Sequence, residues 1–388
     1  MNIGIVTVWF QRGAAYVSDQ YRKILMGKHD VYIYARGGEN YDIKEEEWND
    51  PKVTRAHKLY SDSWSRVDLK HFESWIKKNS ISLILFNEQK DWEVVCWCKK
   101  NGIQTCAYID YYTRDTIPYF ELYDMLFCNT KRHFSVFKWH PGARYIPWGT
   151  DISQFAPSPD KKNKHNCETL VFFHSAGMGG INTRKGTDLL VEAFQLVQGD
   201  CKLIIQSQVG LDSYGRCGDI IVKDPRIEFI HKTVDPPGLY FLGDVYVYPT
   251  RLEGIGLTII EALSSGLPVI TTNQAPMNEF VEDGITGKLV SCDEERYRFD
   301  NYYWPESNCN KESLAMCMNE YVRNRDSVDK MSISARQYVI RNRDWLNNAK
   351  IVSEIIDNIK PITIENKRLR YLQESSIFYT KNFLRKKR

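Results

Sequence analysis

Two glutamates eight positions apart belong to a segment whose residue types could bind a sugar attached to a phosphate. Residues 253–261 read Glu-Gly-Ile-Gly-Leu-Thr-Ile-Ile-Glu. An ionised carboxylate only accepts hydrogen bonds, and its two oxygens match two neighbouring sugar hydroxyls. Gly254 and Gly256 allow close approach of the backbone, and the first amides of a following helix suit a phosphate. The pattern therefore suggests a nucleotide sugar, although Glu253 and Glu261 could also be solvated acids.

The elements around these glutamates read as one strand, loop, helix and strand unit over residues 244–271. Pro249 ends the first strand, a helix begins near Leu257, and Gly266 with Pro268 stops it. In open α/β sheets ligands bind beyond the carboxyl ends of parallel strands, which is where this loop lies. Helical side chains lean toward the N-terminus, so the Glu261 carboxylate can return to the mouth of the same loop.

The segment from Glu253 to Ala262 resembles the Glu-x7-Glu signature of the family 4 retaining glycosyltransferases. The resemblance covers about residues 1–360 and implies the α/β GT-B fold, two Rossmann-like doubly wound domains that face a central cleft. It also implies that Glu253 holds hydroxyls of the donor sugar and Glu261 the nucleotide ribose. The remaining donor-site residues of this segment would be Gly254, Ile255, Gly256, Leu257 and Thr258.

A second glycine-rich segment, residues 175–186, follows the strand predicted at 169–174 and ends in basic residues at a helix start. Amides and positive charge together suit a phosphate. Lys185 with the glycine after it matches the Lys-Gly of the family, whose lysine contacts the diphosphate. Arg184 would replace an arginine that the family places five or six positions earlier, and Gly177 and Gly179 would line the loop. The alternative is that this glycine cluster forms only a turn.

The nucleotide base leaves a weaker pattern. The strand predicted at 227–230 leads into a segment where relatives hold the base largely through backbone groups, so we predict contacts at His231 and Thr233. Backbone recognition leaves no side-chain signature, and both a UDP-sugar and a GDP-sugar fit. No cofactor and no metal ligand are predicted.

In the first half of the chain, Gly13 and Ala14 follow the first predicted strand, where the family has a Gly-rich loop near the donor diphosphate. This loop lacks the Gly-x-Gly-x-x-Gly of nicotinamide-binding domains. Asp110 lies at the carboxyl end of a later strand, where family members often have a histidine. It could orient the acceptor hydroxyl, or it could cap the turn after the strand.

The 388 residues are enough for two domains, 43% of them are apolar and 26% charged, and no apolar run exceeds strand length. We therefore expect a cytoplasmic protein whose ten cysteines are free thiols rather than a disulfide framework. The predicted parts are an acceptor-side domain (1–157), a donor domain (158–342), a helix crossing back (343–360) and a basic tail (361–388). The tail carries a balance of +6, which leaves −3 elsewhere and disfavours nucleic acid as a partner.

The sequence thus predicts a retaining, metal-independent transferase that moves a sugar from a nucleoside diphosphate to a hydroxyl of a glycan or glycolipid. One alternative is a nucleotide-sugar epimerase of the same fold, and another is an inactive sugar-nucleotide-binding subunit. The tail interleaves basic and apolar residues, which favours peripheral attachment to an anionic inner membrane face. It could equally be solvated or pack on the first domain.

Overall fold

The computed structural model describes residues 1–36, 48–57, 65–159, 169–178 and 184–386. The chain divides into two compact units, one made of residues 1–147 and 349–388 and the other of residues 148–348. This division differs from the limits predicted at 157 and 342. The reason is that Trp148 packs on Trp345 with ring centroids 4.2 Å apart, and Thr150 N donates to Arg343 O at 2.8 Å.

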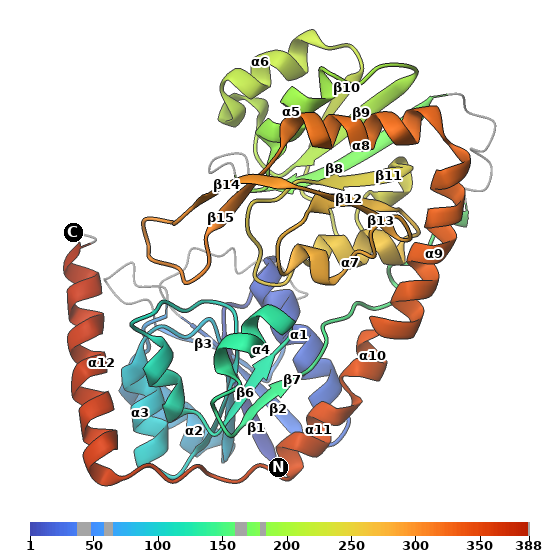
Figure 1. Ribbon diagram of the computed structural model, residues 1–388. Helices are drawn as coiled ribbons and strands as arrows, with labels where there is room; N and C mark the ends of the chain where they lie inside the picture. Colours follow the sequence, from blue (N-terminus) through green and yellow to red (C-terminus); the bar gives the residue numbers. More distant parts are fainter. Residues whose placement is uncertain (37–47, 58–64, 160–168, 179–183, 387–388) are drawn as a thin grey trace. The chain divides into compact units, whose positions relative to one another are not determined.

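The first unit contains a seven-stranded parallel sheet with the strand order β3-β2-β1-β4-β5-β6-β7 (Figure 1). Its strands are β1 (Asn2–Thr7), β2 (Asp30–Ala35), β3 (Val53–Arg55), β4 (Leu83–Asn87), β5 (Gln104–Tyr108), β6 (Met125–Cys128) and β7 (Ala143–Tyr145). Its helices are α1 (Gly13–Leu25), α2 (Leu69–Asn79), α3 (Trp92–Lys100), η2 (Ile117–Leu122), α4 (Lys131–Phe137), α11 (Lys350–Asp357) and α12 (Asn366–Lys386).

Local signals in the sequence explain these elements. Helices cover both faces of a doubly wound sheet, so its central strands are nearly continuous apolar runs, and all five residues of β4 are buried. The helices begin at polar caps: Asp68 accepts hydrogen bonds from the amides of α2, Asp91 from that of Glu93 in α3, and Thr130 from that of His133 in α4.

The second unit contains a six-stranded parallel sheet with the order β10-β9-β8-β11-β12-β13 and a two-stranded antiparallel ribbon. The strands are β8 (Leu170–Gly177), β9 (Cys201–Ser207), β10 (Ile227–His231), β11 (Val245–Tyr248), β12 (Val269–Thr272), β13 (Gly287–Val290), β14 (Cys292–Arg296) and β15 (Glu306–Cys309). The helices are α5 (Thr187–Phe194), η4 (Leu211–Tyr214), α6 (Arg216–Lys223), η5 (Tyr240–Leu242), α7 (Leu257–Ser264), η6 (Met277–Glu279), α8 (Lys311–Arg323), α9 (Asp326–Asn342) and α10 (Trp345–Asn348). Two doubly wound parallel sheets confirm the predicted fold class.

The predicted helix at 343–360 is wrong in detail. The segment forms α10 and α11 instead, separated at Ala349, which is fully buried and is the N-cap residue of α11. The division between the two units falls at this break. Its amphipathic pattern predicted a helix but gave no sign of the interruption.

The basic tail forms helix α12, which runs along α3 of the first unit (Figure 1). Leu372 and Ser376 are fully buried, and Arg368 forms an ion pair with Glu121 at 2.7 Å. The tail therefore packs on the first unit, as one of the alternatives predicted. Across the described part of the chain, no helix combines the length and the apolar character needed to cross a membrane.

Candidate donor site in the second unit

The predicted donor residues come from the two central strands of the second sheet. Strands β8 and β11 are neighbours, but β8 continues through α5 to β9 on one side, and β11 continues through α7 to β12 on the other. The carboxyl ends of β8 and β11 therefore flank a topological switch point, where ligands bind in open α/β sheets. Lys185 follows β8 and Glu253 follows β11, so the topology brings both to this point.

Glu253 is the centre of a hydrogen-bonded cluster and is 8% exposed. Its Oε1 accepts hydrogen bonds at 2.8 Å from Lys185 Nζ, Tyr248 Oη and Thr250 Oγ1. Its Oε2 lies 3.2 Å from Arg184 Nη1. Lys185 Nζ also donates to Tyr248 Oη. The cluster thus joins one carboxylate to two cations that come from a different loop.

The electrostatics of the cluster keep these groups charged. Burial alone would raise the pKa of Glu253, but the charges of Arg184 and Lys185 outweigh it and lower this pKa to about 2. Burial lowers the pKa of Lys185 to about 8, and Glu253 limits that decrease. At neutral pH the site therefore contains an ionised carboxylate and a mainly protonated lysine in direct contact.

The two loops are also joined through their backbones. Arg251 N donates to the carbonyl oxygen of Arg184 at 2.8 Å. The Arg251 guanidinium forms a bidentate ion pair with Asp188 in α5. Gly186 has φ +70°, and a Cβ there would lie 2.0 Å from the carbonyl oxygen of Pro249. Only glycine fits this close approach, which gives the Lys-Gly pair a structural reason.

Helix α7 begins as the sequence predicts, at Leu257, after Gly256 in a left-handed conformation with φ +93°. The amide of Ile259 donates to Gly256 O at 3.1 Å, and the amides of Leu257 and Thr258 precede this first helical hydrogen bond, where a helix N-terminus suits an anion. Ile255 is 4% exposed and Thr258 is half-buried. The buried side chain of Ile255 packs in the interior, so only its backbone could contact a ligand, together with that of Gly254.

Glu261 lies further along α7 and is half-buried. Its Oε2 accepts a hydrogen bond from Tyr240 Oη at 2.7 Å. Burial raises the pKa of Glu261 to about 7, against the opposing effects of the Tyr240 hydroxyl and the charge of Lys185. This acid therefore differs from Glu253, since it changes charge close to neutral pH.

Sequence reasoning missed three hydroxyl groups of this site, those of Tyr240, Tyr248 and Thr250. Tyr248 follows the alternation of β11, which indicates a buried strand residue, and nothing in that pattern predicts a carboxylate partner. Tyr240 belongs to a short 3-10 helix 21 positions from Glu261. Its role depends on a contact distant in sequence, for which the sequence has no signal.

The other predicted donor residues lie at the same edge of the sheet. Gly177 ends β8 with φ +54°, and its carbonyl oxygen accepts from Gln208 N at 2.9 Å. His231 and Thr233 are exposed at the carboxyl end of β10, two strands from β8. Gly179 lies outside the described residues. The structure thus brings together Arg184, Lys185 and Glu253, whereas His231 and Thr233 lie further along the edge.

Three predicted residues belong to the first unit. Gly13 is the first residue of α1, and the carbonyl oxygen of Ala14 accepts from Asn87 Nδ2 at 2.8 Å. Asn87 ends β4, the neighbour of β1, so this hydrogen bond lies at the switch point of the first sheet. Asp110 is half-buried two residues beyond β5. Its proposed action on an acceptor remains a prediction.

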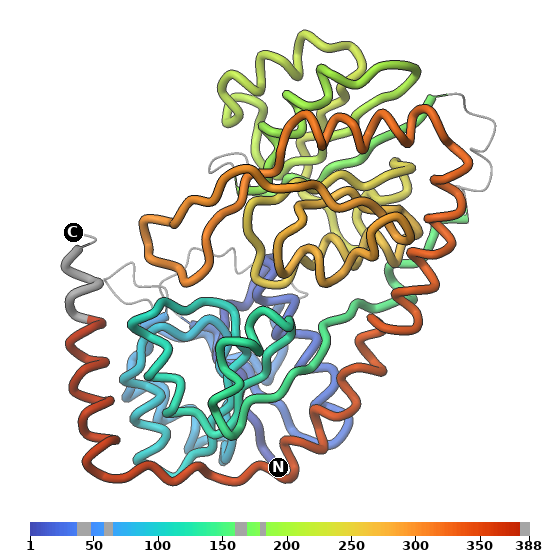
Figure 2. The backbone as a smooth tube through the Cα atoms, viewed as in Figure 1, coloured from blue at the N-terminus to red at the C-terminus, as the bar shows by residue number. Residues whose placement is uncertain are grey.

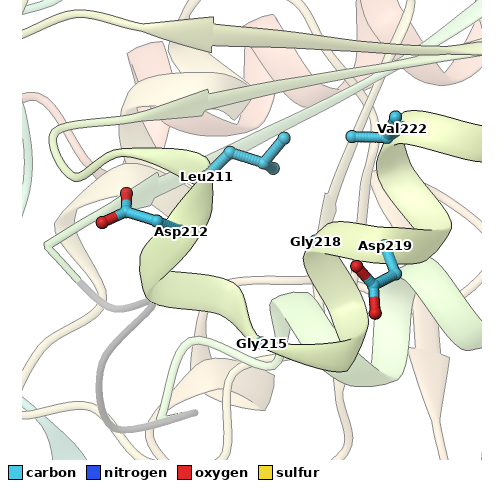
Figure 3. Close-up of a pocket in the computed structure, with 6 residues that line it drawn as sticks. All are labelled: Leu211, Asp212, Gly215, Gly218, Asp219 and Val222. Atoms are coloured by element: carbon cyan, nitrogen blue, oxygen red, sulfur yellow. The ribbon is translucent and has the colours of Figure 1, made fainter.

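A separate surface hollow of about 420 Å³ lies between η4 and α6. Figure 3 shows that Asp212 projects from η4 and Asp219 from α6 around it. Leu211 and Val222 supply apolar side chains, and Gly215 and Gly218 complete the lining. Two acids disfavour an anionic nucleotide, and no predicted donor residue belongs to this hollow.

Comparison with known proteins places the match to a glycosyltransferase family model in this unit. Residues 173–298 match the family model described as Glycosyl transferases group 1. The lipopolysaccharide core biosynthesis mannosyltransferase LpsB of Rhizobium meliloti is 35% identical over 166 residues, which are 39% of this chain and 47% of that protein. The capsular polysaccharide biosynthesis glycosyltransferase CapM of Staphylococcus aureus is 30% identical over 118 residues, 29% of this chain and 31% of that protein. The chain thus spans less than half the length of these curated relatives.

Solved structures match over more of the chain. HepE of Anabaena in complex with UDP and glucose has a TM-score of 0.72 and 17% identity, over 92% of this chain and 100% of that one. A sucrose-phosphate synthase of Thermosynechococcus elongatus has a TM-score of 0.71 and 17% identity, over 92% and 98%. At this identity the likeness establishes the fold. The chain therefore has the GT-B fold, and the part of it that matches the group 1 glycosyltransferase model contains Lys185, Glu253 and Glu261.

Proposed function

We propose that the protein is a retaining glycosyltransferase that moves a sugar from a nucleoside diphosphate to a hydroxyl of a glycan or glycolipid. The observation that carries the proposal is the contact of Glu253 with Lys185 and Arg184 at the switch point of the second sheet. A nucleotide sugar presents a diphosphate and two sets of hydroxyls, which require cations and carboxylates side by side. The names of the relatives further support a role in polysaccharide or lipopolysaccharide biosynthesis.

In the proposed complex the diphosphate takes the place of Glu253 as the main partner of Lys185 and Arg184. Glu253 then accepts hydrogen bonds from hydroxyls of the donor sugar, and the first amides of α7 hold a phosphate. Glu261 accepts from the ribose through the oxygen that Tyr240 does not use. Each group thus supplies a contact that matches its charge and its hydrogen-bonding capacity.

The reaction breaks the bond between the anomeric carbon and the diphosphate oxygen and forms a bond from that carbon to the acceptor oxygen on the same face. Negative charge develops on the departing diphosphate, where Lys185, Arg184 and helix amides stabilise it. The departing oxygen takes the proton of the attacking hydroxyl. Asp110 is proposed to orient that hydroxyl. Two side-chain cations and the amides supply the countercharge, so we propose that the reaction needs no metal.

A lipid-linked acceptor would require attachment to a membrane surface, and α12 has the composition for it. Its exposed residues include Lys367, Arg370, Tyr371 and Phe378, which follow helical spacing along one face. Cations attract anionic lipids and aromatic side chains enter the interface. We therefore propose a cytoplasmic protein that binds the inner face of the membrane peripherally through α12.

Calorimetric titration with UDP, GDP, UDP-glucose and GDP-mannose tests the donor site, because relatives include a protein solved with UDP-glucose and a GDP-mannose-dependent transferase. We expect one of the two nucleotides to bind with chelator present and to raise the melting temperature. Binding of neither nucleotide would contradict the proposal, and binding only after addition of a divalent ion would contradict metal independence. Interconversion of the donor sugar without acceptor would indicate an epimerase.

A further inference from the structure

The β14–β15 hairpin leaves the second sheet at the edge where the candidate donor site lies. β14 starts two residues after β13 ends, and β13 is parallel to the other strands of its sheet, so the hairpin begins at their carboxyl edge. Figures 1 and 2 show it projecting beyond that sheet. Its base is tied to the loop of Glu253, because Ser307 N donates to Arg251 O at 2.9 Å and Arg251 Nε donates to Asn308 Oδ1 at 2.5 Å.

The tip of this hairpin, residues 297–305, contains five aromatic residues in nine positions. Two of them point outward: Phe299 is 94% exposed and Tyr297 is 63% exposed. The alternate residues form a brace inside the tip. Asp300 accepts hydrogen bonds from Arg298 Nε at 3.0 Å and Arg298 Nη2 at 2.8 Å, and Arg298 lies over the ring of Tyr302.

This brace orders the turn that carries the outward rings. Tyr302 is 5% exposed, and Tyr302 N donates to Asp300 Oδ1 at 3.3 Å. Asn301 between them has φ +57°, a left-handed conformation that asparagine tolerates in turns. Presentation of an aromatic ring from a braced turn costs a ligand little ordering entropy. Phe299, which is 94% exposed on this ordered turn, is therefore suited to contact a partner.

The tip also lies within electrostatic range of the donor site. Burial acts against the charged form of Arg298, the ion pair with Asp300 raises its pKa, and the positive charge of Arg184 partly opposes that increase. Arg184 in turn contacts Glu253. A ligand that stacks on the tip would be bound by the hairpin whose strand β15 is hydrogen-bonded to Arg251, two residues before Glu253.

The charge of the hairpin disfavours anionic ligands. From Cys292 to Cys309 it carries five acids against two arginines, a net charge of −3. Four of the acids belong to the two strands, and in the tip Arg298 pairs with Asp300, so the strands repel an anionic membrane, a nucleic acid and a free nucleotide while the tip itself is neutral. A saccharide has no such charge, and the apolar faces of its rings fit exposed aromatic side chains. The acids can accept hydrogen bonds from its hydroxyls.

We propose that the β14–β15 tip binds the acceptor as an oligosaccharide, with Phe299 and Tyr297 as stacking platforms beside the donor site. That this saccharide is the acceptor rests on the proposed function, whereas saccharide binding by the tip does not. The residues act on binding and not on bond formation, because they are not among the groups that contact the diphosphate or the donor sugar.

The test compares the parent chain with Phe299→Ala and Tyr297→Ala. An array of immobilised oligosaccharides built from hexoses and N-acetylhexosamines is the probe, followed by titration of the best binder. We expect each variant to lose about tenfold or more in saccharide affinity, since loss of a buried aromatic contact commonly has that effect. UDP or GDP affinity should stay unchanged in both.

Phe241→Ala is the matched control, because Phe241 is 45% exposed and lies just before β11, at the opposite edge of the same sheet. It should bind saccharide as the parent does. Equal affinity in the tip variants and the parent would overturn the inference, as would a parent that binds no saccharide on the array. An equal loss of nucleotide affinity would assign the tip to the donor site instead. Absence of nucleotide binding in the parent, with saccharide binding intact, would contradict only the proposed function.

Discussion

Lys185 Nζ lies 2.8 Å from Glu253 Oε1, although 68 positions separate the two residues in the chain. The contact exists because β8 and β11 are neighbours while their connections run to opposite sides of the sheet. It makes Glu253 the countercharge of the same cations that are proposed to hold the diphosphate. Donor binding must then exchange one negative partner of Lys185 for another, and this exchange determines what the first substitution should do.

Glu253→Gln should lower turnover and leave nucleotide affinity intact. The amide keeps the shape of the side chain but loses the charge, so each charged hydrogen bond to the donor sugar weakens by about 1.5–3 kcal/mol, or roughly 10- to 150-fold in rate. Lys185 and Arg184 lose a competing anion, so affinity for UDP or GDP should not fall. Steady-state rates and calorimetric titration measure the two effects.

Glu282→Gln is the control for loss of one negative charge, since Glu282 is an exposed acid of the same unit. It should retain the parent's rate. Transfer by Glu253→Gln at the parent's rate would exclude Glu253 from the donor site.

Glu261 should give donor affinity a pH dependence near neutrality. Its folded pKa of about 7 lies above the ordinary value of 4.5 because burial disfavours its charged form. Ribose hydroxyls donate to the ionised carboxylate, so affinity for UDP-glucose or GDP-mannose should rise between about pH 6 and 7.5 and then fall above about pH 8, where Lys185 loses the proton with which it holds the diphosphate. The diphosphate of these donors does not titrate in this range. Titrations from pH 5.5 to 8.5 should show the rise in the parent and no rise in Glu261→Gln, while the fall above about pH 8 should occur in both.

The raised pKa of Glu261 also predicts that the stability of the fold falls with rising pH, the opposite direction to the rise in donor affinity. A carboxyl group whose folded pKa is raised binds more protons in the folded state, so the free energy of unfolding falls as pH rises from about 4.5 to 7. Glu261→Gln removes this loss, and its melting temperature relative to the parent should therefore increase across that window. A difference that stays constant from pH 4.5 to 8 would contradict the perturbed pKa.

Gly186→Ala should destabilise the second unit through a direct clash. A Cβ at this position would lie 2.0 Å from the carbonyl oxygen of Pro249, and the backbone is left-handed with φ +70°. Gly284→Ala separates the steric clash from the backbone strain. Gly284 has φ +74°, but a Cβ added there would meet no atom within 4 Å. The control should lose about 1 kcal/mol from backbone strain, and Gly186→Ala clearly more. Equal losses in chemical unfolding would mean that the loop moves to accept the methyl group.

Local patterns predicted the parts of the site that lie within one continuous segment. Glycines, a proline stop and strand alternation located the Glu253 loop and the start of α7, because each of these signals acts over a few residues. The hydroxyl partners of the acids were not predictable, because Tyr240 reaches Glu261 only after η5 and α7 pack together. The break at Ala349 was likewise hidden, since an amphipathic pattern continues across α10 and α11.

Membrane attachment through α12 is the last prediction. Removal of the tail would uncover α3, because Leu372 is fully buried against the first unit, so charge reversal is the better change. The double variant Lys367→Glu/Arg370→Glu alters only exposed residues. Each cation near an anionic surface contributes about 1 kcal/mol, so the variant should lose most of its binding to vesicles that contain phosphatidylserine.

Vesicle flotation measures this loss, with Lys223→Glu/Lys330→Glu as the control of equal charge change on exposed residues of the second unit. The parent and the control should float at low salt and detach as salt screens the attraction, while the α12 variant should stay in solution. Flotation of the parent on uncharged vesicles to the same extent would show that charge is not the cause. If the α12 variant and the control behave alike, α12 does not form the membrane contact, and its basic residues serve only the packing exemplified by the Arg368 ion pair with Glu121.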